Sequence, residues 1–392
     1  MLRSLFAGIA GLRAHQQMMD VTGNNIANVN TVGFKSSQAL FEDTLSQMVS
    51  AAGAPQGGNG GANPAQVGLG VRLAGIANNF GQGAAQTTGR NGDLMITGDG
   101  YFAVRKGGEA VYTRAGSFSF DAGGMLVDPH GSAVQGWAAT NGRIDTNGAI
   151  GDVRVTAGRL LPPVATSAVT VSGNLPADSA STTPIVVSIT GYDQQGAALT
   201  YSSTFTKTSP TSWDVTVSDG TAVSAPQAIT FAADGSTPNP TSVALNGVTV
   251  DLSGVTSFAG ASTVAAQDQN GAAIGSLQSF TISPQGTLVG VFSNGLKQPL
   301  AQIAMAVFNN PSGLEKIGDS DYRTTANSGA ALLGAAGTGG RGTLQSGTLE
   351  MSNVDLAQEF TNLIIAQRGF QANSKVISAS DELLQDLVNL KR

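Results

Sequence analysis

Hydrophobic residues in the last forty residues of the chain recur with a heptad spacing. Read from its first member, the stripe contains the apolar residues Leu356, Phe360, Leu363, Phe370, Ile377, Leu384 and Val388, with the polar residues Gln367, Ser374 and Asp381 in its remaining positions. Alternating gaps of four and three residues are typical of a helix that packs lengthwise on another helix. The pattern predicts one long helix within residues 351–392.

Both ends of this predicted helix carry residues suited to helix termini. Ser352 stands before the stripe with Asp355 three residues later, an arrangement that resembles a capping box. Lys391 and Arg392 lie where a helix C-terminus favours cations.

A second stripe of the same kind begins the chain. Its members are Leu2, Leu5, Ile9, Leu12, Gln16, Met19, Gly23 and Ile26, and they predict a helix over residues 2–28. The small residues Ala7, Ala10, Gly11 and Ala14 line the neighbouring face, where another helix could approach closely. Two arrangements remain open: a helix hairpin within one chain, or stripes of many copies packed together.

Between the two predicted helices the pattern changes to strands and turns. Residues 36–48 are balanced between a short helix and an extended arm, and residues 53–61 have the composition of a flexible loop. Short alternating runs separated by Asp-Gly and Asn-Gly turns predict antiparallel strands over 66–145, and the same style returns at 276–310.

These features predict an α+β fold that is mainly β. We predict a terminal helical domain (1–35 and 346–392), a linker or arm (36–65) and a first, discontinuous β domain (66–149 and 271–345). Residues 150–270, richer in Thr, Val and Ser, are predicted to be a second antiparallel β domain inserted into the first. The layout is nested, with the helices outermost in sequence.

Composition excludes several kinds of site. Charged residues make up only 12% of the chain, and its net charge of −6 provides no basic surface for nucleic acid. Cysteine is absent, which excludes disulfides, thiolate metal ligands and a cysteine nucleophile. No apolar run is long enough to cross a membrane, and the first residues lack a persuasive signal-peptide cleavage site. We expect no membrane insertion and no cleaved signal.

Catalytic and metal-binding motifs are also missing from the sequence. His15 and His130 have no second ligand at metal-binding spacing, and neither a P-loop nor a nucleophile elbow is present. Asp93 and Asp99 flank one predicted strand, and Asp121 and Asp128 bracket another, all in positions typical of turns. We predict no catalytic, cofactor or metal site and no enzyme. Paired carboxylates leave one alternative open, a secreted β-rich adhesin or glycan hydrolase.

Several stretches resemble one family, the axial proteins of the bacterial flagellum. They are residues 23–35 (GNNIANVNTVGFK), 66–71 (QVGLGV), 88–104 (TGRNGDLMITGDGYFAV), 112–118 (YTRAGSF), 347–356 (GTLEMSNVDL) and 366–373 (AQRGFQAN). Together they cover both ends and most of the first predicted β domain. Rod members of the family are shorter and lack an outer insert, so the chain resembles the hook members more closely.

The resemblance implies a structural subunit that assembles through its terminal helices into a curved tube around a central channel. Such a tube would transmit motor torque to the filament as a flexible universal joint, with the two β domains as middle and outer shells. The implied partners are further copies of the chain, rod protein, hook cap, hook–filament junction proteins and the flagellar type III export apparatus. The implied location is the extracellular hook region, and a distal rod protein is the nearest alternative.

On this reading the two stripes form the subunit interface. The predicted interface residues are Leu2, Leu5, Ile9, Leu12, Met19, Ile26, Leu356, Phe360, Leu363, Phe370, Ile377, Leu384 and Val388. The polar members Gln367, Ser374 and Asp381 are predicted either to face the channel or to set the register between subunits.

Overall fold

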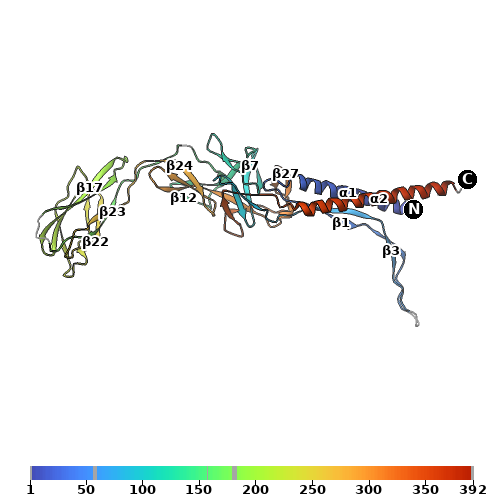
Figure 1. Cartoon of the computed structure of the whole chain (residues 1–392), viewed down its shortest axis with the longest axis horizontal. Coiled ribbons are helices and arrows are strands. Elements are labelled where there is room, and N and C mark those ends of the chain that lie inside the picture. Colours follow the sequence, from blue (N-terminus) through green and yellow to red (C-terminus); the bar gives the residue numbers. More distant parts are fainter. Residues whose placement is uncertain (1, 56–59, 157, 179–182, 390–392) are drawn as a thin grey trace. The chain divides into compact units, whose positions relative to one another are not determined.

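The computed structural model describes residues 2–55, 60–156, 158–178 and 183–389 (Figure 1). The chain forms two compact units. The first comprises Met1–Thr156, Thr281–Val289 and Pro299–Arg392, and the second comprises Ala157–Phe280 and Gly290–Gln298. Within the described residues, no helix is long and apolar enough to cross a membrane.

Two long helices at the chain ends confirm the prediction from the heptad stripes. Helix α1 spans Leu2–Ala27 and helix α2 spans Leu356–Asn389. They lie side by side within the first unit (Figure 1) and run in opposite directions. Near the end of α1, Asn25 Nδ2 donates a hydrogen bond of 3.0 Å to Glu359 Oε1 in the first turn of α2. Near the start of α1, Gly8 faces Ile377, about three turns before the end of the described helix.

The N-terminus of α2 is capped by Asp355. Its Oδ1 accepts hydrogen bonds from the backbone N–H groups of Ala357 (2.8 Å) and Gln358 (3.2 Å), two donors that have no partner within the helix. Ser352 was predicted as the capping residue, and that prediction is wrong. Its Oγ accepts only the N–H of Val354, at 3.3 Å, before the helix begins. The predicted C-terminal cations Lys391 and Arg392 lie outside the described residues.

Residues 36–50 form an extended arm rather than a short helix. Strand β1 (Ser37–Asp43) pairs antiparallel with β4 (Val71–Asn78), and β2 (Ser46–Ser50) pairs with β3 (Ala65–Gly68). The arm leaves the helix pair beside α1 (Figure 1).

The arm occupies part of the small-residue face of α1. A Cβ at Gly70 would lie 3.2 Å from Ala10 Cβ and 3.4 Å from Ala7 Cα. These two alanines therefore admit the arm and not another helix, whereas Gly11 faces Asn373 of α2.

The rest of the first unit is an antiparallel β structure. Its main sheet has the order β26–β11–β7–β8–β28–β27, with β29 beside β26, while β30 pairs with β6 and β31 with β5. The strands are β5 (Ala85–Thr87), β6 (Leu94–Thr97), β7 (Tyr101–Lys106), β8 (Glu109–Thr113), β9 (Ser119–Phe120), β10 (Leu126–Val127), β11 (Ala133–Thr140), β12 (Arg143–Ile144), β13 (Gly151–Asp152), β27 (Glu315–Gly318), β28 (Asp321–Arg323), β29 (Leu332–Ala335), β30 (Thr343–Ser346) and β31 (Thr348–Glu350).

An aromatic cluster lies in this β structure near the base of the helices. The Tyr101 ring contacts those of Phe308 and Tyr322 at centroid distances of 5.6 and 5.8 Å, and Phe80 contacts both tyrosines. Burial raises the pKa of Tyr101 and of Tyr322, so both hydroxyls stay neutral at physiological pH.

The second unit packs two sheets around one apolar core. One sheet has the order β21–β22–β15–β23 and the other β16–β17–β18–β19–β20. Trp213, Phe205 and Leu252 are buried between them. The strands are β14 (Leu160–Leu161), β15 (Ala168–Asn174), β16 (Ile185–Tyr192), β17 (Ala198–Ser209), β18 (Ser212–Ser218), β19 (Gln227–Phe231), β20 (Pro238–Asn239), β21 (Ser242–Leu245), β22 (Val248–Thr256) and β23 (Ala265–Gln269). Strands β24 (Gly275–Ile282), β25 (Thr287–Phe292) and β26 (Lys297–Val307) contribute residues to both units.

The cap at Asp355 yields a first prediction. Asp355→Ala removes the acceptor for two backbone donors and should destabilise α2 by about 1 kcal/mol. Circular dichroism at 222 nm during thermal unfolding measures the loss. Ser352→Ala is the control, because the Ser352 hydroxyl accepts no bond from the helix; an equal or larger loss in that variant would contradict the assignment.

Candidate subunit interface and the polar cluster at its base

Small and polar residues form the contact between α1 and α2. Ala14 on α1 and Ala366 and Ser380 on α2 are buried, and Gly11 lies directly over the Asn373 side chain. A Cβ at Gly11 would approach that side chain to 2.7 Å, so the close approach requires glycine or a shift of the neighbour. The helices thus pack tightly along a seam that uses few of their large apolar side chains.

The predicted interface residues fall into two groups. Leu356, Phe360 and Phe370 are exposed. A second group is half-buried: Leu5, Ile9, Leu12, Met19, Ile26, Leu363, Ile377 and Leu384. The side chains of Leu2 and Val388 lie outside the described part of the chain. The polar positions Gln367, Ser374 and Asp381 are exposed. A role for these residues between subunits stays a prediction.

Further apolar side chains that the heptad pattern missed are also exposed on the helix pair. Phe6 on α1 is 64% exposed. On α2 the missed residues are Ile364, Ile365, Val376 and Leu383. A single 3.5-residue stripe drifts around a straight helix, so counting one stripe overlooks apolar residues on adjacent faces. Together with Phe360 (51% exposed), they leave several large apolar side chains of the helix pair in water, as is common where another protein binds.

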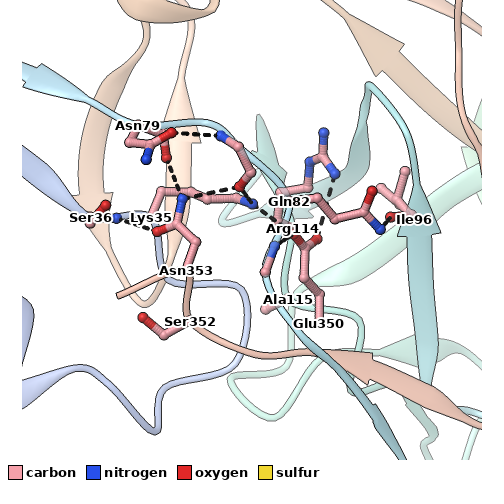
Figure 2. A network of polar contacts seen from close by, with 12 residues as sticks. Lys35, Ser36, Asn79, Gln82, Ile96, Arg114, Ala115, Glu350, Ser352 and Asn353 are labelled. Atoms are coloured by element: carbon pink, nitrogen blue, oxygen red, sulfur yellow. Dashed lines mark hydrogen bonds and ion pairs between the residues drawn. The ribbon is translucent and has the colours of Figure 1, made fainter. Parts of the chain in front are cut away.

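A buried ionic cluster lies where the helices meet the first β structure (Figure 2). Lys35 Nζ donates hydrogen bonds to Glu350 Oε1 (2.6 Å) and to the carbonyl of Gly81 (2.7 Å). Arg114 Nη1 lies 3.5 Å from Glu350 Oε2, and the Gly83 N–H donates to Glu350 Oε1 at 2.9 Å. Lys35 and Glu350 are 315 residues apart in sequence, and both side chains are fully buried.

Neighbouring hydrogen bonds join this cluster to the connection that follows α1 and to the one that precedes α2. Asn353 Oδ1 accepts the N–H of Ser36 at 2.8 Å, and its Nδ2 donates to the carbonyls of Asn79 (2.8 Å) and Gly81 (3.0 Å) (Figure 2). Gly33 has φ +68°, and a Cβ there would lie 2.5 Å from the backbone N of Ala115. The turn after α1 therefore needs glycine to reach the β structure.

Two cations share one carboxylate in this cluster. Burial is the main cause that lowers the pKa of Lys35, the Arg114 charge lowers it further, and Glu350 opposes both. An ionic cluster that is shielded from water is stable only when each of its charges has a partner, because a buried charge without a partner strongly destabilises the fold. The cluster therefore tolerates loss of a member poorly.

The aspartates that could supply a catalytic pair of carboxylates accept hydrogen bonds from the backbone or from a lysine. Asp121 and Asp128 bind backbone N–H groups in turns, as predicted. Asp319 and Asp321, near His130, both accept hydrogen bonds from Lys106 Nζ, at 2.8 and 3.2 Å. Burial raises the pKa of Asp321. Among the residues that the structure describes, no group of three His, Cys, Asp or Glu could hold a metal ion.

The cluster yields a second prediction. Lys35→Met leaves Glu350 and Arg114 buried without their full set of partners, and should destabilise the first unit by about 3–5 kcal/mol. Chemical denaturation followed by tyrosine fluorescence measures this change. The control is Arg323→Met, which removes an exposed ion pair with Glu315 of 3.0 Å. If both variants lost the same free energy of unfolding, the buried cluster would contribute no more than an exposed ion pair, and the prediction would be wrong.

Family models match most of the chain. A flagellar basal body rod protein model matches residues 6–35, and the flagellar hook protein FlgE/F/G D1 domain matches 95–183. The flagellar basal body protein FlaE D2 domain matches 164–272, and the flagellar basal body rod FlgEFG protein C-terminal model matches 345–390.

Relatives match over the whole length. The flagellar hook protein FlgE of Borreliella burgdorferi is 37% identical over 442 residues, covering 100% of both chains. The hook protein of Salmonella typhimurium is 36% identical, covering 99% of this chain and 100% of that one. The basal-body rod protein FlgG of Bacillus subtilis is 34% identical, with 100% of both chains covered.

A solved structure shares the fold. The Helicobacter pylori flagellar hook protein FlgE2 superimposes with a TM-score of 0.50 at 15% identity, covering 68% of this chain and 100% of that one. Paired terminal helices, successive β structures and full-length identity to hook proteins lead to one conclusion: the chain belongs to the flagellar hook protein family.

Proposed function

We propose that the chain is the structural subunit of the bacterial flagellar hook. The observation that carries this proposal is the exposed apolar surface of the terminal helix pair, in a chain whose full-length relatives are hook proteins. In this role copies assemble into a curved tube that transmits motor torque as a flexible joint. The second candidate is a distal rod protein, because a rod protein also matches over the full length.

Burial of the apolar helix surface drives the proposed assembly. In a single chain Phe6, Phe360 and Ile364 remain largely in water. Each square ångström of apolar surface removed from water contributes about 25 cal/mol, so packing of helix pairs from many copies is favourable. The contact joins different surfaces of two copies, and repetition of such a contact with a screw rotation gives an open tube.

The predicted layout assigns a layer to each part of the chain. Residues 1–35 and 346–392 form the inner tube, residues 36–65 an arm, residues 66–149 with 271–345 the middle shell, and residues 150–270 the outer shell. A curved rotating joint requires outer contacts that slide as each side shortens and lengthens in turn. The low charge content, 12% of all residues, suits sliding because few ion pairs need to break.

The proposed partners and location follow from this role. They are rod protein on one side, junction proteins on the other, the hook cap during growth, and the type III export apparatus that delivers the chain without a cleaved signal. The assembled chain lies outside the cell.

Assembly through the helix surface gives a third prediction. Phe360→Asp places a charge on that surface where the side chain is 51% exposed, so the single chain should keep its fold. We expect polymerisation to be abolished while the melting temperature of the β structures stays unchanged. Sedimentation over a concentration series and calorimetry test both. The control is Gln371→Asp, which adds a charge at another exposed position of the same helix and should reduce the efficiency of assembly at most. Normal tubes from Phe360→Asp would refute the interface.

The outer β region gives a fourth prediction. Val164 and Ala272 are joined by two backbone hydrogen bonds of 2.9 and 2.8 Å, so residues 165–271 can be replaced by an Asn-Gly turn. The shortened chain should still polymerise, with changed curvature or stiffness in electron micrographs. Loss of all assembly would contradict the nested layout. Straight tubes from the intact chain would favour the rod alternative.

A further inference from the structure

We propose that Asn141 is a site of spontaneous deamidation, at which the folded chain converts the turn Asn141–Gly142 into an aspartyl or isoaspartyl linkage. The only co-reactant is water. The inference therefore concerns the β structure of a single chain and does not depend on the proposed assembly.

The chemistry takes place within the dipeptide. The backbone nitrogen of Gly142 attacks the side-chain carbonyl carbon of Asn141 and gives up its proton. The new N–C bond closes a succinimide ring, and the side-chain nitrogen leaves as ammonia. Water then opens the ring at either carbonyl, which gives aspartate or, with the backbone routed through the side chain, isoaspartate. Glycine hinders this attack least because it has no Cβ.

Asn-Gly dipeptides recur along the chain, and the structure separates them. Seven are present: Asn59–Gly60, Asn91–Gly92, Asn141–Gly142, Asn147–Gly148, Asn246–Gly247, Asn270–Gly271 and Asn294–Gly295. Asn59 lies outside the described residues. The attack requires a free asparagine side chain, a free glycine N–H and a backbone that can open locally, so hydrogen bonds at these groups slow it.

Two of the pairs are held at both reacting groups. Asn294 Nδ2 donates to the carbonyl of Ala273 at 2.8 Å, and the Gly295 N–H donates to the carbonyl of Phe292 at 2.9 Å. The pair Asn270–Gly271 is held in the same way, through hydrogen bonds of the Asn side chain and of the Gly N–H.

Two further pairs are held through their glycine. The Gly148 N–H donates to the carbonyl of Asp145 at 3.3 Å, and the Gly148 carbonyl accepts the indole N–H of buried Trp137 at 3.1 Å. The Gly92 carbonyl accepts the N–H of Phe118 at 3.2 Å. Opening of the backbone at either pair would break these contacts.

Asn141–Gly142 has none of these restraints. It forms the two-residue turn between β11 and β12, with φ +52° at Asn141 and +74° at Gly142. Asn141 is exposed, and within the described residues neither its side chain nor the Gly142 N–H has a hydrogen-bond partner. Strand β12 is only two residues long, so the hairpin can open locally at little cost.

Asn246–Gly247 is a matched control within the same chain. It forms the same kind of turn between β21 and β22, with φ +51° and +85°. Here, however, Asn246 Nδ2 donates to Asp219 Oδ2 at 3.0 Å. The turn is also flanked by buried Leu245 and Val248 and by a ladder of four residue pairs, which raises the free energy of local opening.

Asp219 strengthens this restraint because it is charged. Backbone hydrogen bonds from Ala222 and Thr221, together with the bond from Asn246, lower the pKa of Asp219, so its carboxylate is ionised at neutral pH. A hydrogen bond to a charged acceptor is stronger than one to a neutral acceptor. Deamidation of Asn246 would also place a second negative charge beside Asp219.

The test compares the two turns in one sample. The intact chain is incubated at neutral pH and physiological temperature, and mass spectrometry of proteolytic peptides measures the deamidated fraction at each Asn-Gly pair with time. Trypsin isolates Asn141 in the peptide 115–143, which contains no other Asn-Gly pair. We expect Asn141 to deamidate at least about tenfold faster than Asn246, because its turn opens more readily.

The same incubation in denaturant removes the fold and keeps the sequence. Glycine follows the asparagine in both pairs, so without the turns and their ladders we expect the two rates to agree within about twofold. The inference would be overturned if Asn246 reacted as fast as Asn141 in the folded chain, if Asn141 stayed unmodified there, or if the tenfold difference persisted in denaturant.

A variant tests the restraint at Asn246 directly. In Asp219→Ser the hydroxyl can still accept a backbone N–H of its own turn but is too short to reach Asn246. We expect deamidation of Asn246 to become at least about twofold faster, with the rate at Asn141 unchanged. Circular dichroism verifies that the β structure is retained. An unchanged rate at Asn246 in a folded variant would contradict the protection assigned to Asp219.

Discussion

The ion pair between Lys35 and Glu350 is the contact on which the architecture of the first unit depends. It joins positions 315 residues apart, at full burial, beside the β structure that both chain ends must reach. The β structures of the two units have apolar cores of their own. The helices instead meet along a narrow seam in which glycines face larger side chains, as Gly11 faces Asn373 and Gly369 faces His15. The ionic cluster joins the connections that follow α1 and precede α2 to the β structure.

The helix pair combines a tight inner seam with an apolar outer face. Glycine and alanine bring α1 and α2 together, and this close approach pushes the larger residues, such as Phe6 and Phe360, to the outside. The same choice of residues therefore brings the two helices close together and leaves large apolar side chains exposed. In the proposed assembly, neighbouring copies would cover these side chains.

Periodicity was sufficient to predict the terminal helices, the strand-rich centre and the turns at Asp121 and Asp128. It did not predict the features that depend on contacts between residues far apart in the sequence. The heptad count placed Leu356 and Phe370 in the seam, whereas Ala366 and Ser380 occupy it, because small residues carry no periodic hydrophobic signal. Ser352 looked like a cap, but the helix begins after Asp355. No local pattern relates Lys35 to Glu350; a buried lysine is visible only once the fold has brought its partner near.

The outer part of the two-stranded arm, formed by β2 and β3, is exposed at every residue of both strands. Gly53 and Ala62 still pair across it, so its strands stay in register up to the loop that connects them. Its length can change by paired residues without moving either helix or any residue of the β cores. In a chain without cysteine, a single cysteine placed on the arm would carry one fluorophore or spin label. The arm is thus a natural position from which to observe a working flagellar joint.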